Sequence, residues 1–360
     1  MARSISQLLI ATLLCGVPTA PTKRLDSSPT IPALQGAPGW SWARLESVGS
    51  PGGVDLETDD EGTLWVIDGA GQFLRRLRAG ESRVWRSING GQFVDISLAD
   101  GTAWIGTDTG KLMSVRFEEL TEVTALTDGE VSAVSASPEN IYAAGRSANG
   151  EGIVVRFETA TGFTSTDQSD FDDPRVVFLD VVGIFNGASD SWVAGGTDGD
   201  GAPGFSLTQQ LCDRGACVRY SSGDNLAADG PINSIWYDDT SGGYLAVGNG
   251  GLLTSVGKDS LPWPLFYPHL EVDKRDLLDV AVCDGRVAAV AGTDGYVAIT
   301  ERGTESWHEL SITSVGDIRS IACAGLRQTT IVALTESGEL IEISQNIKSA
   351  TRVYLPTSIR

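Results

Sequence analysis

Seven similar segments predict an all-β protein, a seven-bladed β-propeller with four-stranded blades. Short apolar runs alternate with glycine-containing turns, the unit recurs with a period mostly in the forties, and helical periodicity is nearly absent. A strand repeat of this length is typical of a propeller, in which each blade buries both faces against its neighbours. We expect the ring to be closed by pairing of the chain termini, because closure removes exposed sheet edges.

The central hairpin of each unit carries the clearest signal. Five copies share a four-residue apolar-rich run, a turn ending in glycine and a second apolar run. Glycine tolerates the positive φ of tight hairpin turns, which explains its place in every copy. Two further copies, from Tyr142 and from Trp192, have longer turns. The five are LAVGNGG at 245–251, AVAGTDG at 289–295, WIGTDTG at 104–110, WVIDGAG at 65–71 and VALTESG at 332–338.

A third strand precedes each hairpin and brings a repeated residue toward the expected channel. Spacings run from 38 residues (Asp95 to Ala133) to 54 residues (Asp180 to Ser234). A ring of carboxylates could coordinate Ca²⁺ or act as acid and base. We favour a structural role, because a residue repeated at one blade position usually bonds to neighbouring backbone. The aligned residues are Asp55, Asp95, Ala133, Asp180, Ser234, Asp279 and Ser320.

Outer strands are indicated around Trp85, Tyr220 and Trp307. The segment 40–46 has the same character, and we expect it to join the last blade; the alternatives are a fifth strand or a cover. Trp65, Trp104 and Trp192 begin the second strand of their blades and are expected in the core, where flat side chains pack between sheets.

Residues 1–20 resemble a secretory signal peptide, with one positive charge before a short apolar run, LLIATLLCGV. The run is too short to span a bilayer. Cys15 is a candidate lipidation site of a lipoprotein signal that would end before it; the alternative is a cysteine discarded with the signal. Residues 21–39 form a Pro/Ser/Thr-rich linker, and 40–356 the propeller. This organisation predicts an extracytoplasmic protein, either secreted, periplasmic or anchored to a bacterial envelope.

Four cysteines remain when Cys15 is set aside, an even number that suits an oxidising compartment. The turn CDRGAC predicts a local disulfide between Cys212 and Cys217. Cys283 lies four residues after Asp279, whereas Cys323 lies three after Ser320, so the two side chains leave equivalent strands from opposite faces. That relationship predicts a bridge between neighbouring blades, with two buried thiols as the alternative.

Several classes of function are disfavoured by composition. The net charge is −21 and there is no basic run, so nucleic acid is not an expected partner. The only histidines are His269 and His308, which argues against a multi-histidine metal site. No nucleophile motif is present. No cofactor is expected, with Ca²⁺ at Asp55, Asp95, Asp180 and Asp279 kept as the alternative.

One aromatic segment is a candidate binding patch. The connection LPWPLFYPHL contains Trp263, Phe266 and Tyr267 in an apolar, proline-rich setting. An exposed aromatic cluster on a rigid scaffold suits a protein or glycan partner. The alternative is that this segment covers the edge of a blade.

The segments LDV, WVAGG, LAVGNGGLL and TERGTESWHEL resemble bacterial propellers related to the photosystem II assembly factor and to sialidase-type repeats. The resemblance implies a seven-bladed extracytoplasmic propeller, a fold that hosts binding scaffolds, sialidases and lyases. Arg302 stands where the sialidase repeat needs Asp, and only Arg319 lies on an inner strand, whereas a sialidase needs three arginines. We therefore expect a non-catalytic binding or assembly scaffold. A glycan-active or lyase-type enzyme and a Ca²⁺-binding surface module are the alternatives.

Overall fold

The structure is a computed structural model that describes most of the chain from Trp40 to Gln345. All described residues belong to one compact unit, Leu34–Arg360. Among them, no helix is both long and apolar enough to cross a membrane. The described residues are 40–45, 47, 50–59, 61–78, 81–87, 91–168, 177–185, 190–197, 205–213, 216–221, 231–238, 243–256, 275–283, 286–301, 304, 306–324 and 330–345.

Four layers of strands run from the centre of the unit outward. The innermost strands are β2 (Asp55–Thr58), β6 (Phe93–Ala99), β10 (Glu130–Ala136), β14 (Val177–Phe185), β18 (Ile232–Asp238), β21 (Leu277–Cys283) and β25 (Ile318–Ala324). The second strands are β3 (Leu64–Asp68), β7 (Thr102–Thr107), β11 (Asn140–Arg146), β15 (Asp190–Thr197), β19 (Gly243–Gly248), β22 (Val287–Gly292) and β26 (Thr330–Thr335).

The third strands are β4 (Phe73–Arg78), β8 (Lys111–Arg116), β12 (Gly152–Glu158), β16 (Phe205–Asp213), β20 (Leu252–Val256), β23 (Tyr296–Glu301) and β27 (Leu340–Gln345). The outer strands are β5 (Glu81–Arg86), β9 (Glu119–Ala125), β13 (Thr164–Gln168), β17 (Ala216–Ser221), β24 (His308–Ser311) and β1 (Trp40–Arg44). Two short 3-10 turns lie between second and third strands, η1 (Asn249–Gly251) and η2 (Thr293–Gly295).

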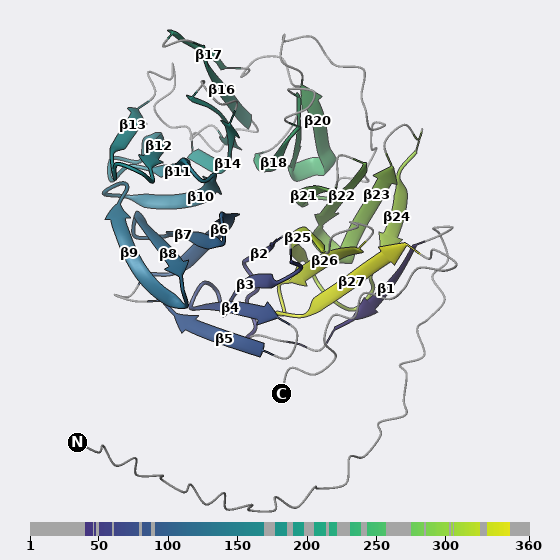
Figure 1. Cartoon of the computed structure of the whole chain (residues 1–360). Helices are drawn as coiled ribbons and strands as arrows, with labels where there is room; N and C mark the ends of the chain where they lie inside the picture. The colour runs from purple at the N-terminus through teal and green to yellow at the C-terminus, as the bar shows by residue number, and fades with distance from the viewer. Residues whose placement is uncertain are drawn as a thin grey trace, which may run out of the picture. The chain divides into compact units, whose positions relative to one another are not determined.

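These strands form antiparallel sheets arranged as a ring (Figure 1). Each innermost strand contacts the innermost strands of two neighbouring sheets, and β2 meets β25 to complete the circle. The prediction of an all-β propeller with four-stranded antiparallel blades is confirmed. Six four-stranded blades are described where seven were predicted, because the sheet β18–β19–β20 shows three strands within the described residues. The segment 257–274, which follows β20, lies outside them.

A β-bulge recurs in the innermost strands directly before the repeated residue. The pairing register shifts between Phe93 and Asp95, and equivalent shifts occur in β10, β14, β18, β21 and β25. A bulge adds one unpaired residue and increases the local twist. The repeated position therefore follows the same local distortion in six sheets, which gives its side chains an equivalent starting geometry.

The N-terminal strand closes the ring, as predicted for residues 40–46. β1 pairs antiparallel with β27, from Trp40 opposite Gln345 to Arg44 opposite Ile341. In Figure 1 the purple first strand lies beside the yellow last strand. Trp40 is buried in a core cluster that includes Leu310 of β24, so this outer strand also packs against the preceding blade.

The expected tryptophans lie in the core. Trp65 and Trp192 are buried, and Trp104 is partly buried against the cluster that contains Phe157. Trp65 stacks on Trp85 of the same blade with ring centroids 5.8 Å apart. These contacts confirm that the tryptophans at the second strands fill space between and within sheets.

The predicted inter-blade disulfide is present. Cys283 of β21 and Cys323 of β25 are bonded, with their Cα atoms 5.5 Å apart. The register argument succeeds because the bulges precede Asp279 and Ser320, so both strands run regularly from there to the cysteines. Cys212 and Cys217 lie directly opposite each other on β16 and β17. Their side chains lie outside the described part of the structure, and this second disulfide stays a prediction.

Candidate functional site

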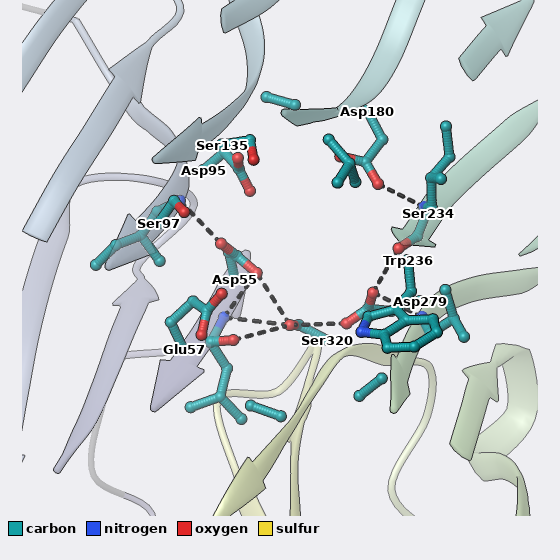
Figure 2. A pocket seen from close by; sticks show the side chains of 18 of the residues that line it. Asp55, Glu57, Asp95, Ser97, Ser135, Asp180, Ser234, Trp236, Asp279 and Ser320 are labelled. Atoms are coloured by element: carbon teal, nitrogen blue, oxygen red, sulfur yellow. Dashed lines mark hydrogen bonds between the residues drawn. The ribbon is translucent and has the colours of Figure 1, made fainter. Parts of the chain in front are cut away.

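The innermost strands surround a central cavity of about 660 Å³. Every sheet contributes lining residues, and the lining includes all four predicted aspartates (Figure 2). A cavity of this size is within the range that holds a small ligand or a side chain of a bound protein. The cavity is therefore the candidate functional site.

Each of the four aspartates bonds its own blade to the next one. In each case the Oδ2 atom accepts the backbone N–H of the residue that follows the equivalent position in the next blade. All four bonds run in the same direction around the ring. They join Ile96 N to Asp55 at 2.9 Å, Val134 N to Asp95 at 2.5 Å, Ile235 N to Asp180 at 2.6 Å and Ile321 N to Asp279 at 2.7 Å.

Ser320 carries the same pattern across the junction where the chain closes. Its Oγ accepts the N–H of Leu56 at 3.2 Å, and it lies 2.9 Å from Asp55 Oδ1 and 3.0 Å from Asp279 Oδ2. A serine hydroxyl has one proton to donate. The hydroxyl therefore donates to one of these two carboxyl groups at a time. Ser234 adds a further bond, from its Oγ to Asp279 Oδ1 at 2.7 Å.

A second polar layer lies two residues further along the innermost strands. Ser97 Oγ accepts the N–H of Ala136 at 3.0 Å, and Ser135 Oγ accepts the N–H of Gly183 at 3.0 Å. Glu57 occupies the same register but accepts the N–H of its own neighbour Thr58 at 3.1 Å. Glu57 therefore departs from the pattern of its layer, and its carboxyl group lines the cavity.

Four of the carboxyl groups that line the cavity have a raised pKa. Burial raises the pKa of Glu57 to about 8, with the nearby charge of Asp55 adding to the shift. Burial likewise raises the pKa of Asp180 to about 7 and that of Asp279 to about 6. For Asp95, burial and then the charge of Asp55 raise the pKa well above its ordinary value. The cavity lining is thus partly protonated near neutral pH.

The arrangement differs from what a Ca²⁺ site requires. Calcium takes six to eight oxygen ligands, mostly ionised carboxylates and carbonyls. The predicted aspartates do share one ring, but their oxygen atoms accept hydrogen bonds from backbone N–H groups. Among the described residues, no group of three or more His, Cys, Asp or Glu side chains is placed to hold a metal ion.

Arg319 is the arginine that sequence analysis placed on an inner strand, and it lines the cavity. Its guanidinium group lies 3.0 Å from Glu336 and 3.5 Å from Asp317, so its charge is balanced locally. His308 begins the outer strand β24. Outside the described residues lie His269, Cys15, Arg302 and the predicted patch of Trp263, Phe266 and Tyr267.

Sequence reasoning did not single out two residues that line the cavity, Glu57 and Trp236 (Figure 2). Both stand two positions after the repeated residue, where β6 and β10 have Ser97 and Ser135. A comparison of this position between the seven units would have identified Glu57 and Trp236, because the other units have smaller side chains there.

Comparisons with known proteins give the fold alone. A scan against models of protein families finds no match, and a search of curated proteins finds none. The chain is a β-propeller. Solved structures similar to it include YCF48 from Cyanidioschyzon merolae, with TM-score 0.61 and 14% identity, covering 84% of this chain and 98% of that chain.

A structure of YCF48 bound to D1 peptide matches with TM-score 0.60 and 14% identity, covering 88% of this chain and 100% of that one. The WD40 β-propeller domain of Doa1 matches with TM-score 0.64 and 12% identity, over 85% of this chain and 96% of that one. The expected likeness to the photosystem II assembly factor, YCF48, is thus confirmed for the fold.

Proposed function

We propose that this chain is an extracytoplasmic, non-catalytic propeller that acts as a protein-binding scaffold. The observation that carries the proposal is that most polar groups around the cavity are bonded to other groups of the protein. The aspartates bond blades to one another and Arg319 is paired with acidic neighbours, so the candidate groups that the sequence singled out maintain the ring. A rigid ring suits recognition, because a partner then binds without first ordering the scaffold.

The proposed ring has seven blades, and β18, β19 and β20 are the three inner strands of the blade that lies between those of β14 and β21. This sheet contacts the innermost strands of both neighbouring blades, β14 and β21. Its Ser234 stands in the repeated register and bonds to Asp279 of the following blade. The first relation holds for all six four-stranded blades, and the second is shared with Ser320, whose Oγ lies 2.9 Å from Asp55 of the blade that follows.

Two features support an extracytoplasmic location. Disulfides persist mainly in oxidising compartments, and Cys283 and Cys323 form one. The N-terminal sequence resembles a signal peptide. In this proposal residues 1–20 direct export, residues 21–39 are a linker and residues 40–356 form the propeller. Cys15 is the site of a lipid anchor if the signal is of the lipoprotein type.

A protein partner is supported by the use of this fold elsewhere. The structural neighbour YCF48 has been solved bound to D1 peptide, so a propeller of similar structure binds a peptide. Fold likeness at this level does not transfer the partner. The proposal takes from it only the class of ligand, a protein segment.

Affinity isolation followed by reconstitution tests the proposal. The oxidised full chain would be immobilised and used to isolate proteins from a native envelope extract, with the reduced and heat-unfolded chain as control. We expect an enriched protein that, once purified, binds the folded chain in calorimetry. Turnover of sialosides or polysaccharides that Asp180→Asn or Glu57→Gln abolishes would overturn the non-catalytic reading. A large rise in the unfolding temperature with Ca²⁺ but not Mg²⁺ would favour the metal-binding alternative.

A further inference from the structure

The turn between β8 and β9 has a backbone conformation, with positive φ, that its two residues rarely adopt. Arg116 pairs with Glu119, which leaves Phe117 and Glu118 as a two-residue hairpin loop. Both have positive φ, 49° for Phe117 and 71° for Glu118. Such loops prefer Asn-Gly or Asp-Gly, and a bulky residue with positive φ is a true outlier. Backbone strain of this kind persists only where the surroundings enforce it, and it concentrates at functional sites.

The residue held in this conformation is an exposed aromatic. Phe117 is 89% exposed, the highest value among the large apolar side chains of the described residues. Its ring packs only lightly, with the guanidinium carbon of Arg116 5.1 Å from the ring centroid. Phe163 offers a comparison: it is 57% exposed, but the positive φ of its turn belongs to Gly162. Exposure and backbone strain therefore coincide at Phe117 and not at Phe163.

The neighbouring blade holds the turn in place. The carboxylate of Glu118 lies 2.6 Å from Arg83 on β5 and 3.2 Å from Arg76 on β4. Trp85 Nε1 also donates a hydrogen bond to the Glu118 carbonyl at 3.2 Å. Arg76 in turn lies over the ring of Trp65, 5.7 Å from its centroid. These contacts fix Glu118 and so present Phe117 on a rigid base.

The surface around Phe117 differs in charge from the rest of the molecule. The hairpins β4–β5 and β8–β9 contain seven basic side chains against four acidic ones, in a chain whose net charge is −21. Ion pairs balance part of this charge, because Arg75 pairs with Asp68, Arg78 with Glu61 and Arg83 with Glu118, but Arg78 and Arg83 stay about half exposed. Aromatic residues and arginine are the types enriched at interface hot spots. The local positive charge complements an acidic ligand, whereas the rest of the chain would repel one.

We propose that Phe117 is the anchor of a docking surface for an acidic protein segment that carries an apolar side chain. The apolar side chain packs on the Phe117 ring, and the carboxylates pair with Arg116 and with the half-exposed Arg83, whose five N–H donors can serve a second carboxylate beside Glu118. A short segment fits this surface better than a second copy of the chain, because two copies of charge −21 repel each other. The inference rests on the proposed scaffold function and assigns the surface and the chemistry of its partner.

A selection of displayed random peptides against the full chain tests the proposal, with the Phe117→Asn variant as counter-selection. We expect enriched peptides to combine several Asp or Glu residues with one large apolar residue. A synthetic enriched peptide should bind about tenfold or more weakly to Phe117→Asn, and its affinity should fall with added salt. The matched variant Phe163→Asn should bind like the original chain.

We expect Phe117→Asn to raise the stability of the fold and to lower the affinity for the peptide. Asn tolerates positive φ better than Phe, so Phe117→Asn should unfold at a higher temperature while it binds the peptide more weakly. The proposal would be overturned if enriched peptides bound the original chain and Phe117→Asn equally, if they were basic, or if none were enriched over the variant. Peptides that bind both chains equally would overturn this inference but would leave the scaffold function standing. Concentration-dependent dimers that Phe117→Asn abolishes would identify a second copy as the occupant and also overturn it.

Discussion

The Oγ atom of Ser320 lies 2.9 Å from Oδ1 of Asp55, although the two residues are 265 positions apart in the sequence. This contact joins the last innermost strand to the first one. The pairing of β1 with β27 joins the termini again at the outside of the same blade. The ring is thus closed twice, near the cavity by side chains and at the rim by a strand.

Ser320→Ala should destabilise the fold more than the same change at Ser97. Ser320 contacts Asp55, Asp279 and the N–H of Leu56, whereas Ser97 accepts one bond, from Ala136. Leaving buried polar groups unpaired costs about 1–3 kcal/mol. Urea unfolding monitored by tryptophan fluorescence measures both losses. Equal losses in the two variants would contradict the closing role of Ser320.

Stability should fall as the pH rises from about 4.5 to about 8. Burial, with the charges of Asp55 and Asp279, raises the pKa of Glu57 from 4.5 to about 8 in the folded state. Within that window the native state holds a proton that the unfolded chain has released, so the free energy of unfolding decreases with pH. Glu57→Gln should flatten this slope in urea titrations at several pH values. Glu81→Gln, on the exposed strand β5, should leave it unchanged, and an unchanged slope in Glu57→Gln would refute the assignment.

Removing the disulfide should weaken the ring without abolishing it. The Cys283–Cys323 bridge closes a loop with a sequence separation of 40. The chain-entropy estimate for a loop of this length is roughly 4 kcal/mol, less any strain in the native state. The double variant Cys283→Ala/Cys323→Ala should lose about 2–4 kcal/mol in guanidinium unfolding. Peptide mapping without reductant should find the bridge in the original chain; free thiols at both positions would contradict the prediction.

Gly110→Ala should cost more stability than Gly101→Ala. Both glycines have positive φ, +74° and +70°, so both variants carry backbone strain. A Cβ atom at Gly110 would lie 2.4 Å from the carbonyl oxygen of Thr127, whereas one at Gly101 would meet nothing within 4 Å. We expect a loss of about 1 kcal/mol for Gly101→Ala and roughly 1–3 kcal/mol more for Gly110→Ala. Similar unfolding midpoints for the two variants would show that the turn can move away.

The sequence alone determined the class of fold, the order of strands and the closing strand. Hairpin turns and strand alternation are local properties, so the glycines of motifs such as LAVGNGG and AVAGTDG reveal them directly. The pairing of Cys283 with Cys323 was also accessible, because the repeat supplies a common register and the two side chains stand on opposite faces.

Only the tertiary structure decided what the side chains of that framework do. Ile96 N–H donates a hydrogen bond to Asp55 of another blade, and Glu118 forms ion pairs with Arg76 and Arg83 of another blade. The pKa of Glu57 is raised mainly because the packed sheets bury its carboxyl group. The register of the repeat predicts which residues occupy equivalent positions on the innermost strands. The distances between their side chains and the burial of a carboxyl group depend on how neighbouring sheets pack. Packing of sheets is a non-local property, and for that reason the exposed, strained Phe117 gave no signal in the sequence.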